Sequence, residues 1–408
     1  MARLRTIGFE AKGVASSETT GFEGVLASPA ALETTIVRSG LNSVKCDSGG
    51  ANQAAFVQLG LSAAESVLGR SYYTRWYVYV ASYPGSTIGI AKIVNGSSDG
   101  FAIQMTSTGA LRLVSLIAAT PTQIGSDSVP VNQNQWLRLE LFSLIATGAT
   151  DAAELRMDGV SLASGSGLNV SDTPPTIVSS GWNPAPGANK ILYLDDIAIN
   201  DDQGSSQNSW PGEGKIVVLK PISDNAVGTG WVDGDGAGTL FGSVDNIPPV
   251  GVGTAADGTQ IKNLTSTTTG NYDANCTTYA NAGIVAGDLI TVVQAVCDHS
   301  EDVNTSTKNG ALQIVSNPTQ SGEDSFTYGD DAGSNGTWPT NWRAKWGTAQ
   351  YLPAVTLTTS AVVRVGKRTA TTRQVDVDFM GIMVEFVQGI FPPWHQQARV
   401  ATNTLIRM

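Results

Sequence analysis

The stretch Tyr193-Leu-Asp-Asp-Ile-Ala-Ile-Asn-Asp201 predicts the closing strand of a β-sandwich. Apolar and polar residues alternate along it, but the alternation changes phase once. The first phase holds Leu192 and Leu194, and the second holds Ile197 and Ile199. Asp195 and Asp196 lie at the change of phase. Because a strand that changes phase needs a bulge or twist there, we expect a bent strand on the rim of a curved sheet.

A polar break follows this strand and predicts the division of the chain. From Asp202 to Gly214 the sequence is rich in Gly, Ser, Asn and Pro, too polar to continue a core. We therefore expect two β-sandwich domains in tandem with an extended C-terminal arm. The predicted parts are a jelly roll over 1–203, a linker over 204–214, a second β-sandwich over 215–390 and the arm over 391–408.

The composition predicts an all-β fold. The chain has 408 residues, enough for two or three domains that each bury a core. Hydrophobic residues make up 41%, an ordinary share, whereas charged residues make up only 14%. The 45 glycines, about 11% of the chain against a usual share of about 7%, fit many short strands joined by tight turns.

The net charge and the lack of long apolar runs argue against several kinds of partner and location. The net charge of -11, without any basic cluster, argues against binding to nucleic acid or to an anionic membrane. No apolar run suits a signal peptide or a membrane span, so we expect synthesis in the cytoplasm without a leader and no membrane insertion. Cys46, Cys276 and Cys297 have no metal-type spacing, and pairing of Cys276 with Cys297 is left open.

Alternating patterns place further strands in the first segment. In Tyr73 to Val80, residues Trp76, Val78 and Val80 are expected in the core, and the tyrosines on the other face. Leu155 to Met157 leads into Asp158-Gly159, a pair suited to a two-residue hairpin turn. Strands this closely spaced, without a helical period, predict a sandwich or jelly roll.

These motifs together resemble a known family. The ordered set resembles the concanavalin-A-like (laminin-G-like) jelly roll, and with the linker residues it looks like tailed-bacteriophage and prophage structural proteins of that fold. The motifs are Gly8-Phe-Glu10, Ser39 to Lys45, Tyr73 to Tyr79, Thr106 to Leu113, Trp136-Leu-Arg-Leu-Glu140, Leu155 to Gly159, Tyr193 to Asp201, Asn208-Ser-Trp-Pro-Gly-Glu-Gly-Lys215 and Leu219-Lys-Pro221. The resemblance covers the first segment and the linker.

The second segment ends in a long strand and an arm. In Val375 to Val387 the apolar phase is expected to change at Gly381, as it does in the first closing strand. Pro392-Pro393 then stops the strand and holds the chain extended. The arm carries the apolar residues Phe391, Trp394, Leu405 and Ile406. We expect it to contact another copy or another protein, with folding back over its own sandwich as the alternative.

No catalytic set is recognisable, so the sequence predicts that the chain is not an enzyme. Glucanases with this jelly roll use two carboxylates along one strand, and no comparable run occurs here. Asp376 and Asp378 share a strand face but alternate with core residues, which favours a solvated face. His299 and His395 have no Ser or Cys in a recognisable setting for a triad.

Two groups of residues are candidates for binding. Asp195 and Asp196 could bind Ca²⁺, the one cofactor considered, although a role in a turn or bulge is favoured. Aromatic and acidic residues around 330–346 could stack and hydrogen-bond a glycan if one helical turn aligned the rings. These residues are Trp338, Trp342, Trp346, Asp330 and Asp331. The favoured alternative is a short helix whose rings plug the end of the second sandwich.

These observations predict a structural protein of a bacteriophage virion, exposed as a head decoration, a head fibre or a tail-associated component. Its expected partners are other virion proteins and further copies of itself. The alternative is a carbohydrate-binding adhesin that recognises a host surface glycan, and a virion component could serve in both roles.

Overall fold

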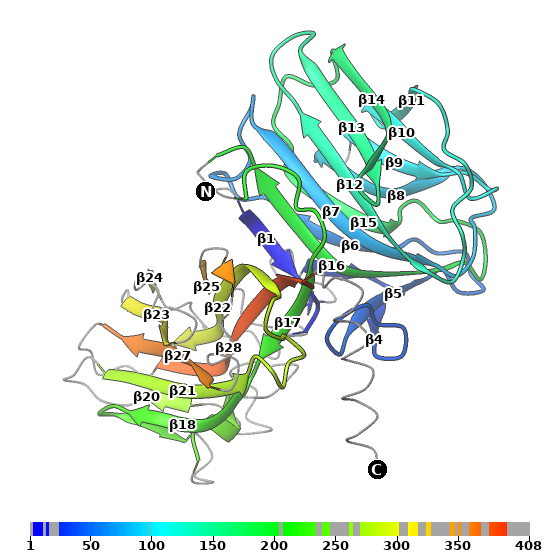
Figure 1. The fold of residues 1–408 in the computed structure, drawn as a ribbon. Helices are drawn as coiled ribbons and strands as arrows, with labels where there is room; N and C mark the ends of the chain where they lie inside the picture. The colour runs from blue at the N-terminus through cyan, green and yellow to red at the C-terminus, as the bar shows by residue number, and fades with distance from the viewer. Residues whose placement is uncertain are drawn as a thin grey trace.

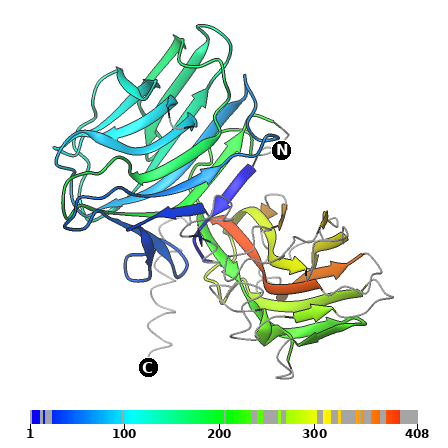
Figure 2. The same cartoon turned by 180° about the vertical axis from the view of Figure 1, so that it is seen from behind.

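In the computed structural model the chain forms two β-sandwiches, one above the other in Figure 1 and seen from behind in Figure 2. The all-β prediction is confirmed. The described part of the chain contains no α-helix, only a 3-10 turn at Phe241–Ser243, and no helix there could span a membrane. The structure describes residues 3–10, 14–15, 24–96, 98–203, 207–233, 239–244, 261–263, 270–301, 309–316, 324–327, 343–346, 350–351, 359–368 and 375–389.

The first sandwich consists of two eight-stranded sheets. Sheet 1 contains β1 (Arg3–Ile7), β4 (Ala31–Glu33), β5 (Ser43–Asp47), β7 (Ser71–Val80), β12 (Trp136–Leu144), β13 (Asp151–Met157), β14 (Val160–Leu168) and β16 (Ile191–Asp201). Its order is β14-β13-β12-β7-β16-β5-β4, with β1 paired to β16. Sheet 2 contains β2 (Val14–Ala15), β3 (Gly24–Ala27), β6 (Ala55–Gly60), β8 (Ile88–Asn95), β9 (Asp99–Met105), β10 (Leu111–Ile117), β11 (Thr120–Ile124) and β15 (Ile177–Trp182). Its order is β11-β10-β9-β8-β15-β6-β3-β2.

The second sandwich is smaller. Sheet 3 contains β17 (Lys215–Leu219), β19 (Trp231–Asp233), β20 (Ile261–Asn263), β22 (Leu289–Glu301), β25 (Arg343–Trp346), β26 (Gln350–Tyr351) and β28 (Val375–Val387). Its order is β19-β20-β28-β22-β25, with β17 on β28 and β26 on β22. Sheet 4 contains β18 (Pro221–Val227), β21 (Gly270–Thr278), β23 (Asn309–Ser316), β24 (Asp324–Thr327) and β27 (Ser360–Lys367), in the order β18-β21-β27-β23-β24.

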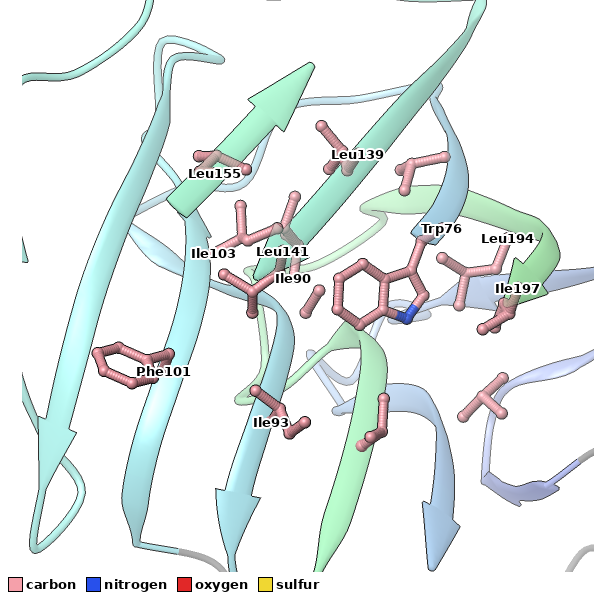
Figure 3. Close-up of a cluster of buried hydrophobic side chains, with 14 of the residues drawn as sticks. Trp76, Ile90, Ile93, Phe101, Ile103, Leu139, Leu141, Leu155, Leu194 and Ile197 are labelled. Atoms are coloured by element: carbon pink, nitrogen blue, oxygen red, sulfur yellow. The ribbon is translucent and has the colours of Figure 1, made fainter. Parts of the chain in front are cut away.

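Each sandwich has its own apolar core. In the first, Trp76 projects from β7 between the sheets, with Leu194 and Ile197 on one side and Ile90 and Leu141 on the other (Figure 3). This confirms the alternation predicted for β7. The second core runs through both of its sheets and includes Leu219, Tyr272, Ile290, Val363 and Ile382. Cys46, Cys276 and Cys297 are buried and none forms a disulfide.

The predicted bulge in β16 is confirmed. The register with β7 shifts between Asp195 and Ala198, and Asp196 has a φ of 47°. Because of this shift, the apolar residues on both sides of the bulge face the same core. The expectation of a rim strand is wrong, since β16 lies inside sheet 1 between β7 and β5 and also accepts β1.

The closing strand β28 also has a register shift, but not where the sequence placed it. Opposite β22, Phe379 pairs with Asp298 and Val377 with His299, so the irregularity lies at Asp378 and not at Gly381. The second core takes Val377 before the shift and Met380 after it. Gly381 pairs regularly with Val296.

The two sandwiches meet through buried polar contacts. Glu385 of β28 forms ion pairs with Arg3 of β1 at 2.7 Å and with Arg75 of β7 at 2.6 Å. Both arginines belong to the first sandwich, and all three residues are almost completely buried. Figures 1 and 2 show β1, β17 and β28 at this junction.

Candidate functional site

The outer face of sheet 1, opposite the core, carries a row of aromatic residues. The alternation of β7 and β12 directs their leucine, valine and Trp76 side chains inward and the intervening residues outward. Tyr79 pairs directly with Trp136 of β12 on one side and with Tyr193 of β16 on the other. Tyr193 in turn pairs with Lys45 of β5. We call Lys45, Tyr193, Tyr79 and Trp136 the aromatic row.

The rings of the aromatic row hold one another in place. The ring centroids of Tyr79 and Trp136 are 5.6 Å apart with an interplanar angle of 61°. Tyr79 and Tyr193 are also 5.6 Å apart, at 84°. Edge-to-face contacts of this kind favour fixed ring orientations. All three side chains are partly exposed, so each offers apolar surface to solvent beside its polar group.

Charged groups lie at one end of the aromatic row. Lys45 forms an ion pair with Asp47 at 2.9 Å, and both side chains are about one-third exposed. The hydrogen bond to Asp47 raises the pKa of Lys45. Burial opposes ionisation of Asp47, but the hydrogen bond and charge of Lys45 outweigh it and lower its pKa. Burial raises the pKa of Tyr193, so its hydroxyl stays neutral and can both donate and accept hydrogen bonds.

The other aromatic residues of this face contact further parts of the chain. The guanidinium of Arg38 lies 3.2 Å from the ring centroid of Tyr77, which is 6% exposed. Further along, Trp210 contacts Tyr73 at 5.4 Å and Phe142 at 6.4 Å between ring centroids. Tyr77 is therefore buried, whereas Tyr73, Phe142 and Trp210 stay partly exposed, as the rings of the aromatic row do.

The acidic pair in β16 is engaged in the junction. Asp196 accepts hydrogen bonds from the hydroxyl of Ser39 at 2.7 Å and the N–H of Ile216 at 2.9 Å, and forms an ion pair with Arg38. With its oxygens held by donors, Asp196 does not fit a calcium site. Its contacts support the favoured role in a bulge.

Asp195 differs from its neighbour because it has no basic side chain paired with it in the described contacts. It accepts hydrogen bonds from the backbone N–H groups of Arg38, Ser39 and Asp196. Burial, together with the charges of Asp196 and Glu10, raises its pKa well above the usual range. Both of its oxygens are thus also engaged by donors, and no cluster of three acidic, His or Cys ligands occurs among the described residues.

The other predicted site residues fall mostly outside the described residues. This holds for Trp338, Trp342, Asp330 and Asp331, and for Phe391, Trp394, Leu405 and Ile406 of the arm. Trp346 ends β25, and the helical turn expected there is wrong, because Arg343–Trp346 is a strand paired with β22.

Sequence reasoning placed the tyrosines of β7 on the outer face but did not nominate them as a site. The signal was the alternation itself, which put Tyr79, Trp136 and Tyr193 outward on three strands. Which residues are neighbours depends on strand order and register, and the sequence does not specify either.

Comparisons with known proteins concern the fold. No family model and no curated protein matches the chain. An endo-β-1,4-glucuronan lyase from the fungus Trichoderma reesei matches with 12% identity and a TM-score of 0.37, over 48% of this chain and 95% of the lyase. The cellulose induced protein Cip1 matches with 18% identity and a TM-score of 0.37, over 51% and 99%. Alginate lyase Aly36B matches with 10% identity and a TM-score of 0.35, over 48% and 95%.

The expectation that the chain is not an enzyme is corrected by these matches, which include two polysaccharide lyases. That expectation depended on the absence of the paired carboxylates that glucanases use. Lack of one catalytic motif does not exclude the other chemistries that a β-sandwich can carry.

Proposed function

We propose that this protein binds carbohydrate on the outer face of sheet 1, through the aromatic row. The observation that carries the proposal is the alignment of three partly exposed aromatic side chains on adjacent strands, with the Lys45–Asp47 pair at one end. Sugar rings have apolar C–H faces that pack on aromatic rings, and hydroxyls that bond to charged groups and tyrosines. The row supplies both kinds of contact.

The experiment is a screen of the purified protein against bacterial surface glycans, followed by titration of the best ligand. Trp136→Ala and Tyr79→Ala should each weaken binding about tenfold, which corresponds to about 1.4 kcal/mol. Val160→Ala, an exposed apolar position on β14 of the same sheet, is the matched control and should leave affinity unchanged. Absence of any glycan ligand, or binding insensitive to both aromatic substitutions, would contradict the proposal.

We further propose that the protein is a component of a tailed-bacteriophage particle, made in the host cytoplasm and exposed on the virion as a head decoration, fibre or tail-associated protein. The support is the resemblance of its ordered motifs, from Gly8-Phe-Glu10 to Leu219-Lys-Pro221, to phage structural proteins. A surface-exposed glycan-binding module would serve host attachment. Mass spectrometry and antibody labelling of purified particles test this: a protein found only in the infected-cell lysate would refute it.

The C-terminal arm is proposed to contact other virion proteins or further copies of the chain. Phe391, Trp394, Leu405 and Ile406 are too few to form a core of their own, and aromatic anchors often dominate protein contacts. Deletion of residues 391–408 should leave the melting temperature nearly unchanged while abolishing self-assembly or incorporation into particles. A truncated protein that melts much earlier as a monomer would instead show that the arm covers its own sandwich.

Calcium at Asp195 is a further proposal, supported by the position of its carboxyl next to Asp196 at the bulge and by Glu10, whose carboxylate binds the same 38–42 segment as Asp195 does. A bound ion would stabilise the folded state, so added Ca²⁺ should raise the melting temperature and a chelator should lower it. Asp195→Asn should remove this response. Equal melting temperatures with Ca²⁺ and with chelator would contradict the proposal.

A further inference from the structure

The segment from Gln207 to Gly214 lies along the same face of sheet 1 as the aromatic row. Its indole, Trp210, contacts Tyr73 and Phe142, which form a direct cross-strand pair of β7 and β12. The guanidinium of Arg156 lies 3.9 Å from the Trp210 ring centroid. Tyr73 and Phe142 are thus a second aromatic surface on this face, and the chain's own tryptophan occupies it.

Backbone contacts fasten this segment to the face. The N–H of Gly212 donates to Glu140 at 2.9 Å, and Arg75 donates to the carbonyl of Gly212 at 3.2 Å. Arg38 donates to the carbonyl of Gly214 at 2.6 Å. Glu140 and Arg75 are themselves buried. These contacts hold the segment in place over the middle of strands β7 and β12.

Arg38 covers the part of the face that lies between the aromatic row and Trp210. Tyr77 lies two residues from Tyr79 on β7, so its ring would otherwise continue the aromatic surface along the strand. Arg38 lies over that ring at 3.2 Å and is anchored by its ion pair with Asp196. A ligand that contacts Tyr79 therefore meets Arg38, and beyond it Trp210, if it extends along β7.

Resting on the proposed function, we propose that Arg38 and Trp210 restrict the site to a short saccharide lying across the strands, from Lys45 to Trp136. The row crosses β5, β16, β7 and β12, which neighbour one another at about 4.8 Å, so its length is about 14 Å. With one ring on each aromatic residue, the site holds about three sugar units. Arg38 and Trp210 then determine the direction of the ligand, and the extent of the row determines its length.

The test is a series of oligosaccharides of increasing length, cut from the glycan identified for the wild type. Affinity should rise up to about three units and then level off. Tyr193→Ala and Trp136→Ala, which remove the first and the last of the three rings in the row, should each move the plateau about one unit shorter. Trp210→Ala should leave the affinity for a trisaccharide within about twofold, because Trp210 does not touch the row.

The outcomes separate this inference from the proposed function. Affinity that keeps rising well beyond three units, or a plateau moved by only one of the two end substitutions, would overturn the crosswise arrangement while leaving glycan binding intact. Failure of the wild type to bind any member of the series would overturn both. If Trp210→Ala does not fold, Arg156→Ala, which removes the partly exposed cation over the indole together with its ion pair to Glu154, replaces it with the same expected result.

Discussion

Glu385 belongs to the second sandwich, yet its charge is balanced by Arg3 and Arg75 of the first. Removing one partner of a buried ion pair leaves the others uncompensated, which typically costs about 3–5 kcal/mol. Glu385→Ala should therefore lower the free energy of unfolding by about that amount in urea titrations. Glu154→Ala, which breaks the partly exposed pair with Arg156, is the control and should cost no more than about 1 kcal/mol. Equal losses in the two variants would contradict this assignment.

The same residue predicts a response to acid. Burial opposes ionisation of Glu385, but the charges of Arg3 and Arg75 outweigh it and hold its pKa below the usual 4.5. The folded state thus binds fewer protons, so this contribution to stability is present above about pH 4.5 and is lost as the pH falls through the lowered pKa. Unfolding free energies measured from about pH 7 to about pH 3 should fall less steeply in Glu385→Gln than in the wild type. Parallel curves would show that other carboxyls control the acid response.

At the scale of single elements, the sequence predicted a strand's irregularity better than its place in the sheet. The change of apolar phase in β16 required a bulge, because both phases had to reach one core. Its neighbours β1 and β5 come from far away in the sequence, and no local pattern reveals such pairing. In β28 the sequence pattern placed the shift at Gly381 and the structure has it at Asp378. Phe379 and Met380 are both apolar, so the alternation alone does not show where the phase changes.

Gly8 of the first sandwich packs closely against Ile216 of β17. A Cβ on Gly8 would lie 2.7 Å from Cγ2 of Ile216, a β-branched side chain with little freedom to move. Gly8→Ala should therefore lower the free energy of unfolding by about 1–3 kcal/mol, as overpacking usually does. Gly50→Ala, whose added Cβ would find its nearest neighbour at 4.0 Å, should change it little. An unchanged free energy of unfolding in Gly8→Ala would mean that Ile216 and its neighbours can move to accommodate the added methyl group.

At the scale of the whole molecule, the sequence predicted two β-sandwiches but not the site. The aromatic row exists only after four strands align, and its members are up to 148 positions apart in the chain, from Lys45 to Tyr193. The candidates that sequence proximity suggested, around Trp338 to Trp346, depended on a helical turn, and the structure has a strand at Arg343–Trp346. A candidate surface whose residues are spread over a sheet leaves no compact motif in the sequence.

Division of the chain within 204–214 remains a prediction. The contacts at the junction add the expectation that the two parts stay associated after the chain is cut. Limited proteolysis should cut in this stretch and give two resistant pieces. Because the Glu385 ion pairs and the hydrogen bonds of Ile216 to Asp196 and Ser39 hold the sandwiches together, the pieces should elute as one species under native conditions. A single resistant core that spans the stretch would contradict the division into two domains. Pieces that separate at once would contradict their association through the junction.

The buried cysteines give each sandwich a chemical reporter of its own opening. Cys46 lies in the first core, and Cys276 and Cys297 lie in the second. Burial raises the pKa of Cys46 and Cys276, so neither is a reactive thiolate while the fold is closed. Alkylation rates at these thiols therefore measure how often each half opens. Equal rates for Cys46 and Cys276 would mean that the halves open in one cooperative event, and unequal rates would rank their separate lifetimes without any added label.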